Sequence, residues 1–250
     1  MGIQIKNITA GYDRHPAIHH VSGTFSSGSL TAVIGPNGSG KSTLLKTIAG
    51  FIKPMSGELN FTEANKKRIG YLPQIAEIDR TFPLSVYDVV MMGHWPSCGN
   101  FGSVSLKQRE QALAALDEVG MEAFAQRSIG ALSSGQFQRV LFARLMLQNA
   151  DILLLDEPFS AIDTRTAHDL LHLIEAWHKK GKTVLTVLHD MEQVKHHFPE
   201  TLILAREIVA WGPTATALTD KHLASAQELS QHWHDDAVAC RRDTMSDEAA

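Results

Sequence analysis

The pattern of apolar and polar positions divides the chain into strand-like and helical stretches. Near the N-terminus, Ile3 and Ile5 alternate with polar neighbours, and Gly and Pro residues interrupt the chain from there to about residue 28, so short strands joined by turns are expected. The apolar run 31–35 then leads through a glycine-rich turn into a helical stretch at 42–49. A further strand is predicted at Ile69–Leu72.

From residue 84 to about 147 the apolar positions follow a helical spacing instead. Residues 106–120 form an amphipathic helix that ends at a glycine, and a further helix is expected at Ser134–Leu147. After that point strands and helices alternate again. The predicted elements are strands at 152–156, 183–190, 201–205 and 207–211 and a helix at Thr164–Lys179.

Near-continuous apolar strands separated by helices are typical of a parallel sheet that is covered on both faces. We therefore predict an α/β fold with a helical insertion at about 84–148. The polar residues from about Gln231 onward are expected to fray, so the predicted C-terminal tail, 221–250, is partly disordered.

Composition and charge exclude several classes of protein. The 250-residue chain is 44% hydrophobic and 20% charged, which excludes wholesale disorder, collagen-like repeats and a coiled-coil rod. Its net charge of −4 argues against a general nucleic-acid binder. We expect neither a secretory signal nor a membrane span, because no apolar run approaches the ~20 residues of a spanning helix. Cys98 and Cys240 have no metal or disulfide spacing, so a reducing cytoplasm is expected.

Residues 35–42 read GPNGSGKS and match the phosphate-binding pattern G-x-x-x-x-G-K-[ST]. They follow a predicted strand and open a helix, which is the context that this loop requires. Its glycines let backbone N–H groups turn toward phosphate oxygens, while Lys41 reaches the β- and γ-phosphates and the Ser42 hydroxyl binds Mg²⁺. The loop indicates a nucleotide but not the purpose it serves.

The run ILLLDEP at 152–158 is a buried strand that ends in two acids. Asp156 is predicted to lie in the Mg²⁺ shell, and Glu157 beside the γ-phosphate, where its carboxylate can polarise an attacking water. An ordinary strand end with solvated acids is the alternative, and the phosphate-binding loop argues against it.

Three further features gain meaning only when they are taken together. Gln74 follows a predicted strand and is placed to meet Mg²⁺ and the attacking water. The run LSSGQ at 132–136 opens a helix whose N–H groups and dipole favour an anion. His189 also follows a strand and is expected at the γ-phosphate. Taken alone, each has an ordinary alternative: a surface glutamine, a capped helix or a satisfied histidine.

These motifs, in this order, resemble those of the ATP-binding subunit of an ABC transporter over about residues 3–215. The resemblance makes 35–42 the Walker A loop, Gln74 the Q-loop, 132–136 the signature, Asp156 and Glu157 the end of Walker B, and His189 the switch histidine. It implies a P-loop NTPase fold with a mostly parallel sheet, an N-terminal antiparallel β-subdomain and the helical subdomain inserted in an ATPase domain spanning 1–220.

The resemblance also implies a head-to-tail dimer in which each ATP lies between the Walker A loop of one copy and the signature of the other. Asp163, at the end of the run SAID, would cross the interface, and Tyr12 would stack on adenine. Ser134 departs from the usual LSGGQ, which costs little at negative φ and about 1 kcal/mol at positive φ. The implied catalytic residues are Gln74, Glu157 and His189, and the implied Mg²⁺ ligands are Ser42, Gln74 and Asp156. The implied ATP contacts are Tyr12, Gly35, Pro36, Asn37, Gly38, Ser39, Gly40, Lys41, Ser42, Thr43, Ser133, Gly135, Gln136 and Asp163.

The segment QIAEIDRTFPLSVYDVVMMG, which begins at Gln74, resembles the equivalent part of ATPases from zinc, manganese and iron importers. The later run HDMEQVKHHFPETLILAREIVAWG most resembles a zinc-uptake ATPase. The resemblance implies ATP-driven import of a divalent metal, zinc ahead of manganese, through a permease that docks at 79–94. It also implies a position on the cytoplasmic face of the inner membrane, an extracytoplasmic metal-binding protein as an indirect partner, and no nucleic acid.

Several alternatives stay open. GHWPSCGNFG at 93–102 loosely resembles a loop of siderophore and cobalamin importers. A soluble single-cassette protein is another class, and a small-molecule P-loop kinase would have no reason to carry LSSGQ. The 13 histidines include the pairs His168 and His172, His196 and His197, and His232 and His234. We expect surface residues rather than a metal site. The alternative, a site that senses metal, would fall on His232 and His234, near Asp235 and Cys240.

Overall fold

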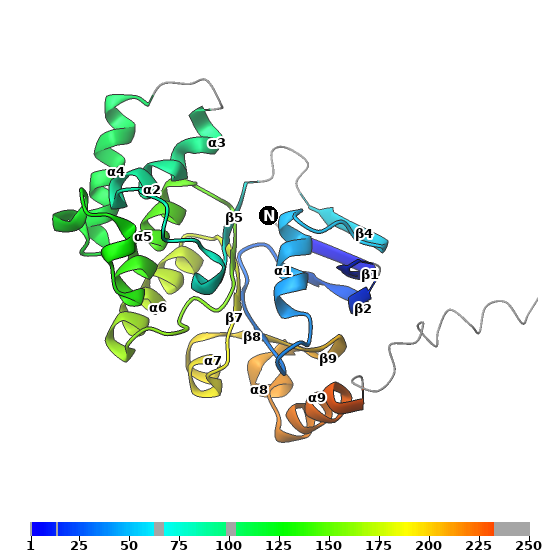
Figure 1. Ribbon diagram of the computed structural model, residues 1–250. Helices are drawn as coiled ribbons and strands as arrows, with labels where there is room; N and C mark the ends of the chain where they lie inside the picture. Colours follow the sequence, from blue (N-terminus) through cyan, green and yellow to red (C-terminus); the bar gives the residue numbers. More distant parts are fainter. Residues whose placement is uncertain (1, 14, 63–67, 99–103, 233–250) are drawn as a thin grey trace, which may run out of the picture. The chain divides into compact units, whose positions relative to one another are not determined.

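The computed structural model describes residues 2–13, 15–62, 68–98 and 104–232. The chain divides into two compact units, each built from separate stretches of sequence. Unit 1 contains residues 26–30 and 63–188, and unit 2 contains residues 2–25, 31–62 and the chain from 189 onward. Figure 1 labels most of the helices and strands of both units.

Unit 2 begins with an antiparallel sheet, as the N-terminal alternation predicts. Strands β1 (Ile3–Tyr12), β2 (His15–Phe25) and β4 (Ser56–Phe61) pair in the order β2-β1-β4. Ile3 and Ile5 are buried while the polar residue between them is exposed, because successive side chains of a strand point to opposite faces. Helix α1 (Lys41–Ala49) contacts β1 and β2 (Figure 1).

The remainder of unit 2 combines parallel and antiparallel strands. Strand β3 (Leu30–Ile34) pairs in parallel with β8 (Glu200–Ala205), which pairs antiparallel with β9 (Glu207–Pro213). The helices are α7 (Met191–His197), α8 (Thr214–Ala217) and α9 (Asp220–His232), and the last two contact β8 and β9. The predicted tail, 221–250, therefore begins inside a packed helix; residues 233–250, with His234, Asp235 and Cys240, lie outside the described residues.

Unit 1 contains the parallel strands β5 (Ile69–Leu72), β6 (Ile152–Leu155) and β7 (Thr183–Val187), in that order. Every residue of β6 and β7 is buried, as the apolar runs predict. The strand predicted at 183–190 is wrong at its end, since the chain leaves the strand after Val187 and Asp190 caps α7.

Helices make up the rest of unit 1, and Figure 1 shows them grouped together. They are α2 (Val86–Met91), α3 (Trp95–Cys98), α4 (Leu106–Glu118), α5 (Ser134–Leu147) and α6 (Thr164–Lys179). Helix α5 contacts α2, α4 and α6, so the predicted insertion at 84–148 packs together as helices. Both units combine helices with parallel strands, which confirms the α/β class. Among the described helices, none has the length and apolar character needed to span a membrane.

Candidate functional site

The loop between β3 and α1 in unit 2 is shaped by its glycines. Gly35 has a φ of 149°, and a Cβ atom at this position would lie 2.0 Å from the carbonyl oxygen of Leu204. Gly40 has a φ of 92°, and its Cβ would lie 2.3 Å from Cγ2 of Ile18. Because real Cβ atoms do not approach so closely, only glycine allows the loop to pack against β2 and β8 in this way.

Lys41, the first residue of α1, folds back over the same loop. Its side chain is buried, and Nζ donates hydrogen bonds to the carbonyl oxygens of Gly35 at 2.9 Å and Pro36 at 2.8 Å. A buried ammonium group is costly unless it is hydrogen-bonded, and these carbonyls supply that compensation. The loop thus encloses a positive charge at a helix N-terminus, which suits phosphate oxygens.

The backbone of Arg206, in the turn between β8 and β9, is hydrogen-bonded to this loop. Its N–H donates to the carbonyl oxygen of Ser39 at 2.9 Å, and its carbonyl oxygen accepts from the N–H of His19 at 2.8 Å. Arg206 has a φ of 63°, an uncommon conformation for a residue other than glycine. We did not predict this role, because the only sequence signal is a break between two apolar runs.

Tyr12 and His189 are the other predicted site residues in unit 2. Tyr12 ends β1 and its side chain is 51% exposed, which is high for an aromatic residue. His189 is exposed and precedes Asp190, whose carboxylate caps α7 by accepting from the N–H groups of Glu192 and Gln193. Both rings are therefore accessible to a ligand.

Asp156 follows β6 in unit 1 and its side chain is fully buried. The hydroxyl group of Tyr71 donates to Oδ2 of Asp156 at 3.1 Å. A buried carboxylate is tolerated where it is hydrogen-bonded or coordinates a metal. Because carboxylate oxygens are the ligands that Mg²⁺ prefers, Asp156 fits the predicted magnesium site.

The next residue, Glu157, has a φ of 49°. A left-handed conformation costs a residue with a side chain about 1–2 kcal/mol, and such strain is concentrated at functional sites. The carboxylate is half-buried, and its Oε2 accepts a hydrogen bond from the Ser160 hydroxyl at 2.9 Å. The side chain predicted to act as a base is thus held by a short local contact.

Gln74 follows β5, the strand that pairs in parallel with β6. The register pairs Leu72 with Leu155, so Gln74 and Asp156 leave the sheet at the same edge. The side chain of Gln74 is half-buried, and the chain continues into a single turn of 3₁₀ helix at Ile75–Glu77. The structure therefore brings Gln74, Asp156 and Glu157 to one edge of unit 1.

Arg80 joins the segment after Gln74 to the start of the signature. Its Nη2 donates to the carbonyl oxygen of Ile129 at 3.2 Å and also to that of Leu132. The guanidinium lies 5.0 Å from the ring centroid of Phe137 on α5, within cation–π range. Sequence reasoning missed Arg80, because no pattern links residues that lie about fifty positions apart.

The signature forms the N-terminus of α5 in unit 1. Ser133 Oγ accepts from the Gln136 N–H at 3.2 Å, and Gln136 Oε1 accepts from the Ser133 N–H at 3.0 Å, which is a capping box. Ser134 is the first helical residue and is not among the described residues with positive φ, so serine costs little here. The N–H groups of Ser134 and Gly135 have no acceptor within the helix, which leaves two donors for an anion.

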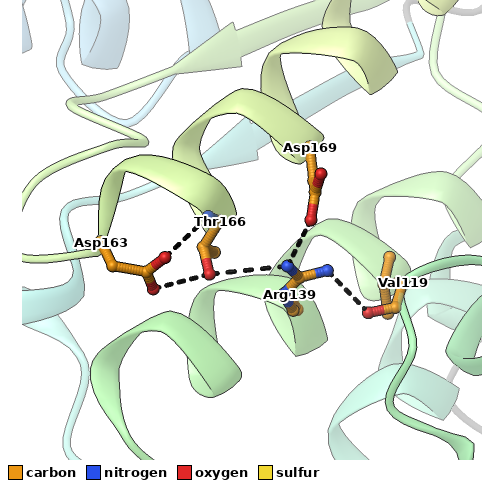
Figure 2. Close-up of polar contacts among 5 residues, drawn as sticks. All are labelled: Val119, Arg139, Asp163, Thr166 and Asp169. Carbon is orange, nitrogen blue, oxygen red and sulfur yellow. Dashed lines mark hydrogen bonds and ion pairs between the residues drawn. The ribbon is translucent and has the colours of Figure 1, made fainter.

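Asp163 caps α6, and Figure 2 shows its contacts with Thr166. Its carboxylate accepts from the Thr166 N–H at 2.9 Å and the Thr166 hydroxyl at 2.8 Å, and these bonds hold the pKa of Asp163 below its usual value. A Cβ added to Gly135 would lie 3.4 Å from Oδ2 of Asp163, so the Asp163 carboxylate lies next to Gly135. Unit 1 therefore brings together Ser133, Gly135, Gln136 and Asp163.

The predicted site residues thus fall into two sets. Unit 2 holds Tyr12, the loop 35–43 and His189, while unit 1 holds the edge with Gln74, the two acids after β6, the signature and Asp163.

The paired histidines His168 and His172 stand edge to face, with ring centroids 4.3 Å apart. No group of three or more His, Cys, Asp or Glu side chains is arranged to hold a metal within the described part of the chain.

Known proteins are similar to this chain in sequence. Residues 18–160 match the family described as "ABC transporter". The manganese transport system ATP-binding protein MntB of Listeria monocytogenes is 38% identical over 228 residues, which cover 90% of this chain and 95% of that protein. The zinc transport system ATP-binding protein TroB of Treponema pallidum is 37% identical over 228 residues, covering 90% and 86%.

Solved structures agree with the fold. An ABC transporter described as of metal-chelate type, in an inward-facing conformation, aligns with a TM-score of 0.80 at 29% identity, covering 91% of this chain and 89% of that one. The dimeric structure of a bacterial ABC transporter cassette aligns with a TM-score of 0.73 at 26% identity, covering 84% and 98%. The chain therefore belongs to the ABC transporter family. Within it, the chain is the ATP-binding and ATP-hydrolysing cassette.

Proposed function

We propose that this cassette powers the import of a divalent transition metal through a membrane permease, with zinc ahead of manganese as cargo. The observation that carries the proposal is similarity over 90% of the chain both to a manganese and to a zinc transport ATP-binding protein. The preference for zinc rests on the run 189–212 alone. An ATPase subunit has no need to contact the cargo, so uptake measurements must decide between the metals.

ATP is bound by residues 35–43, with Lys41 at the β- and γ-phosphates and Tyr12 stacked on the adenine. The buried ammonium group of Lys41 and the close packing of the loop against β2 and β8 support this assignment. A loop that is rigid before the nucleotide arrives loses little entropy when it binds.

Ser42, Gln74 and Asp156 hold Mg²⁺, which neutralises charge on the phosphates when it is bound. Glu157 accepts the proton of the attacking water, and His189 contacts the γ-phosphate. The fully buried carboxylate of Asp156 and the position of Gln74 at the end of the neighbouring strand support these roles.

The chain acts as a head-to-tail dimer, in which Ser133, Gly135 and Gln136 of one copy bind the nucleotide held by the other. Asp163 crosses the interface between the copies. Two observations support this arrangement: the N–H groups at the start of α5 that the helix leaves without acceptors, and the dimeric structure of a similar cassette.

The permease docks on the segment 79–94 and its immediate neighbours. Phe82 is 61% exposed and Trp95 is 59% exposed, so this part of the chain offers two large apolar side chains to a partner. The cassette then works at the cytoplasmic face of the cell membrane, and an extracytoplasmic metal-binding protein delivers the cargo to the permease.

Uptake of radiolabelled Zn²⁺ and Mn²⁺ at limiting metal tests this function. Cells without another importer would carry the wild type, Glu157→Gln, or the control Glu58→Gln, which changes an exposed carboxylate on β4. We expect Glu157→Gln to abolish zinc uptake and the control to retain it. Loss of manganese uptake alone would refute the zinc preference, and unchanged uptake of both metals would refute the cargo while leaving the ATPase in place.

Import of a metal chelate is a second candidate, and the similarity to a transporter described as of metal-chelate type favours it. The same strains would then retain uptake of the free metals. They would lose uptake of a radiolabelled iron–siderophore complex or of cobalamin when Glu157→Gln replaces the wild type.

A further inference from the structure

Helices α5 and α6 face each other through regularly spaced residues. Gly135 and Arg139 are four positions apart on α5, and Asp163, Thr166 and Asp169 recur every third position from the cap of α6. Residues at these spacings share one face of a helix. Figure 2 shows Arg139 pointing from α5 toward Thr166 and Asp169 on α6.

Arg139 is held by three acceptors. Its Nη2 donates to Oδ2 of Asp169 at 2.7 Å and to Oγ1 of Thr166 at 3.5 Å, and its Nη1 donates to the carbonyl oxygen of Val119 at 3.2 Å. The Arg139 side chain is 21% exposed and Thr166 only 7%, so both are largely shielded from water. Shielding strengthens polar contacts and makes their loss costly.

The hydrogen bonds run in one direction toward Asp163. A guanidinium can only donate, while a threonine hydroxyl accepts one hydrogen bond and donates another. Thr166 Oγ1 therefore accepts from Arg139 and directs its own hydrogen to Oδ2 of Asp163, at 2.8 Å. Successive hydrogen bonds of this kind polarise one another, so the orientation of the Asp163 carboxylate depends on Arg139.

We propose that Arg139 is a positioning residue that acts through Thr166 to hold Asp163 against the signature at Gly135. Because the Asp163 carboxylate lies next to Gly135 and is held by the chain of hydrogen bonds, the signature and Asp163 form one patch. The inference rests on the proposed head-to-tail dimer, because the position of Asp163 relative to Gly135 matters for function where a partner copy contacts both residues. Arg139 then sets how well each copy receives the nucleotide of the other.

Dimerisation driven by ATP tests this role in the Glu157→Gln background, which prevents turnover. Sedimentation velocity would measure dimer formation with ATP, and a fluorescent ATP analogue would measure binding at concentrations where the chain is monomeric. Arg139→Met and Thr166→Val should each weaken dimerisation about tenfold, the range typical of coupled contacts. Nucleotide binding by the monomer should not change.

Two features of the design separate positioning from folding. Thr166→Val has almost the same shape and retains the N–H cap and the Arg139–Asp169 ion pair, so it removes only the hydroxyl group in the chain. Arg68→Met is the matched control, because it removes an Arg–Asp ion pair of 3.0 Å from the same unit. Arg68 lies by the C-terminal end of α5, beside Met146 and Leu147, at the opposite end of the helix from the signature. The control should dimerise as the parent does. Thermal unfolding should show that the Thr166→Val monomer, although less stable than the parent, is folded at the temperature of the assay.

The outcomes distinguish the two levels of inference. If the Glu157→Gln parent does not dimerise with ATP, the proposed dimer is wrong. If it dimerises and both Arg139→Met and Thr166→Val dimerise equally well, the positioning role is wrong. The variant with both substitutions should dimerise as well as the more impaired of the two single variants, since each substitution interrupts the same chain of hydrogen bonds. Additive losses of dimerisation would show that Arg139 does not act through Thr166. If Arg139→Met fails to fold, Thr166→Val decides alone.

Discussion

The hydroxyl group of Tyr71 donates a hydrogen bond of 3.1 Å to Oδ2 of the buried Asp156. Tyr71 lies on β5, three residues before Gln74, so the strand that leads to one proposed Mg²⁺ ligand also orients the other. Arg144 on α5 donates in turn to the carbonyl oxygen of Tyr71 at 3.4 Å. Residues that hydrogen-bond to metal ligands fix their orientation, and their loss typically costs about 10–100-fold in metal affinity or activity.

Tyr71→Phe should therefore weaken the use of Mg²⁺ by the cassette. The variant retains the ring and loses only the hydroxyl group, so we expect the Mg²⁺ concentration for half-maximal ATP hydrolysis to rise about tenfold. Electron paramagnetic resonance of bound Mn²⁺ with ATP gives a readout that does not depend on turnover. Tyr87→Phe, on α2 of the same unit, is the control, and an identical metal dependence in the two variants would contradict the prediction.

The loop glycines provide a matched pair of substitutions. Gly40→Ala places a Cβ 2.3 Å from Ile18 and 2.6 Å from the Ala17 carbonyl oxygen, whereas Gly38, with a φ of 76°, has open space around it. Gly38→Ala should cost only the ~1–2 kcal/mol of a left-handed alanine, which lowers Tm by about 2–4 °C per kcal/mol for a chain of this size. Gly40→Ala should lower Tm further and abolish ATP binding. Equal effects in thermal unfolding and nucleotide titration would refute the steric argument.

The sequence predicted those elements whose burial and chemistry show in residues that are neighbours along the chain. The apolar run of β6 followed by Asp156 and Glu157, and the glycine-rich loop before α1, both lie where they were predicted. Helix α9 was mistaken for tail because its surface is polar, and only its contacts with β8 and β9 reveal that it is packed.

The contacts that hold the site are between residues far apart in sequence. Tyr71 and Asp156 are 85 positions apart, and Arg139 and Asp169 are 30 apart. No periodicity or motif encodes such a pair, because the partners meet only after β5, β6 and the helices have packed. The backbone of Ser134 was likewise undetermined by sequence, which allowed either sign of φ at that position.

Restoring the usual glycine in the signature should bring no gain. Ser134 is the first residue of α5 and has a helical backbone, so Ser134→Gly only adds flexibility and should cost about 0.5 kcal/mol. ATP hydrolysis should stay within about twofold of the wild type, as for a surface change that breaks no contact. Ser133→Ala, which removes the cap, should cost about 1 kcal/mol. Urea unfolding and steady-state hydrolysis measure both; a large gain in turnover from Ser134→Gly would show that the serine impairs the signature.

The ion pair between Arg139 and Asp169 should make stability depend on pH in a defined direction. The hydrogen bond from Arg139 holds the pKa of Asp169 below its usual value, so the folded protein binds this proton less tightly than the unfolded chain. The pair therefore stabilises the fold above the unfolded pKa of about 3.9, and this contribution is lost as pH falls through the lower, folded value. Wild type should be more stable than Asp169→Asn at pH 7, and the difference should shrink below about pH 4. Urea unfolding across this range measures it. In an Arg139→Met background the pH-dependent difference should shrink, because Asp169 loses its hydrogen-bonding guanidinium and keeps only the weaker Coulomb attraction of Arg165 and His168. A difference of undiminished size would place the cause elsewhere.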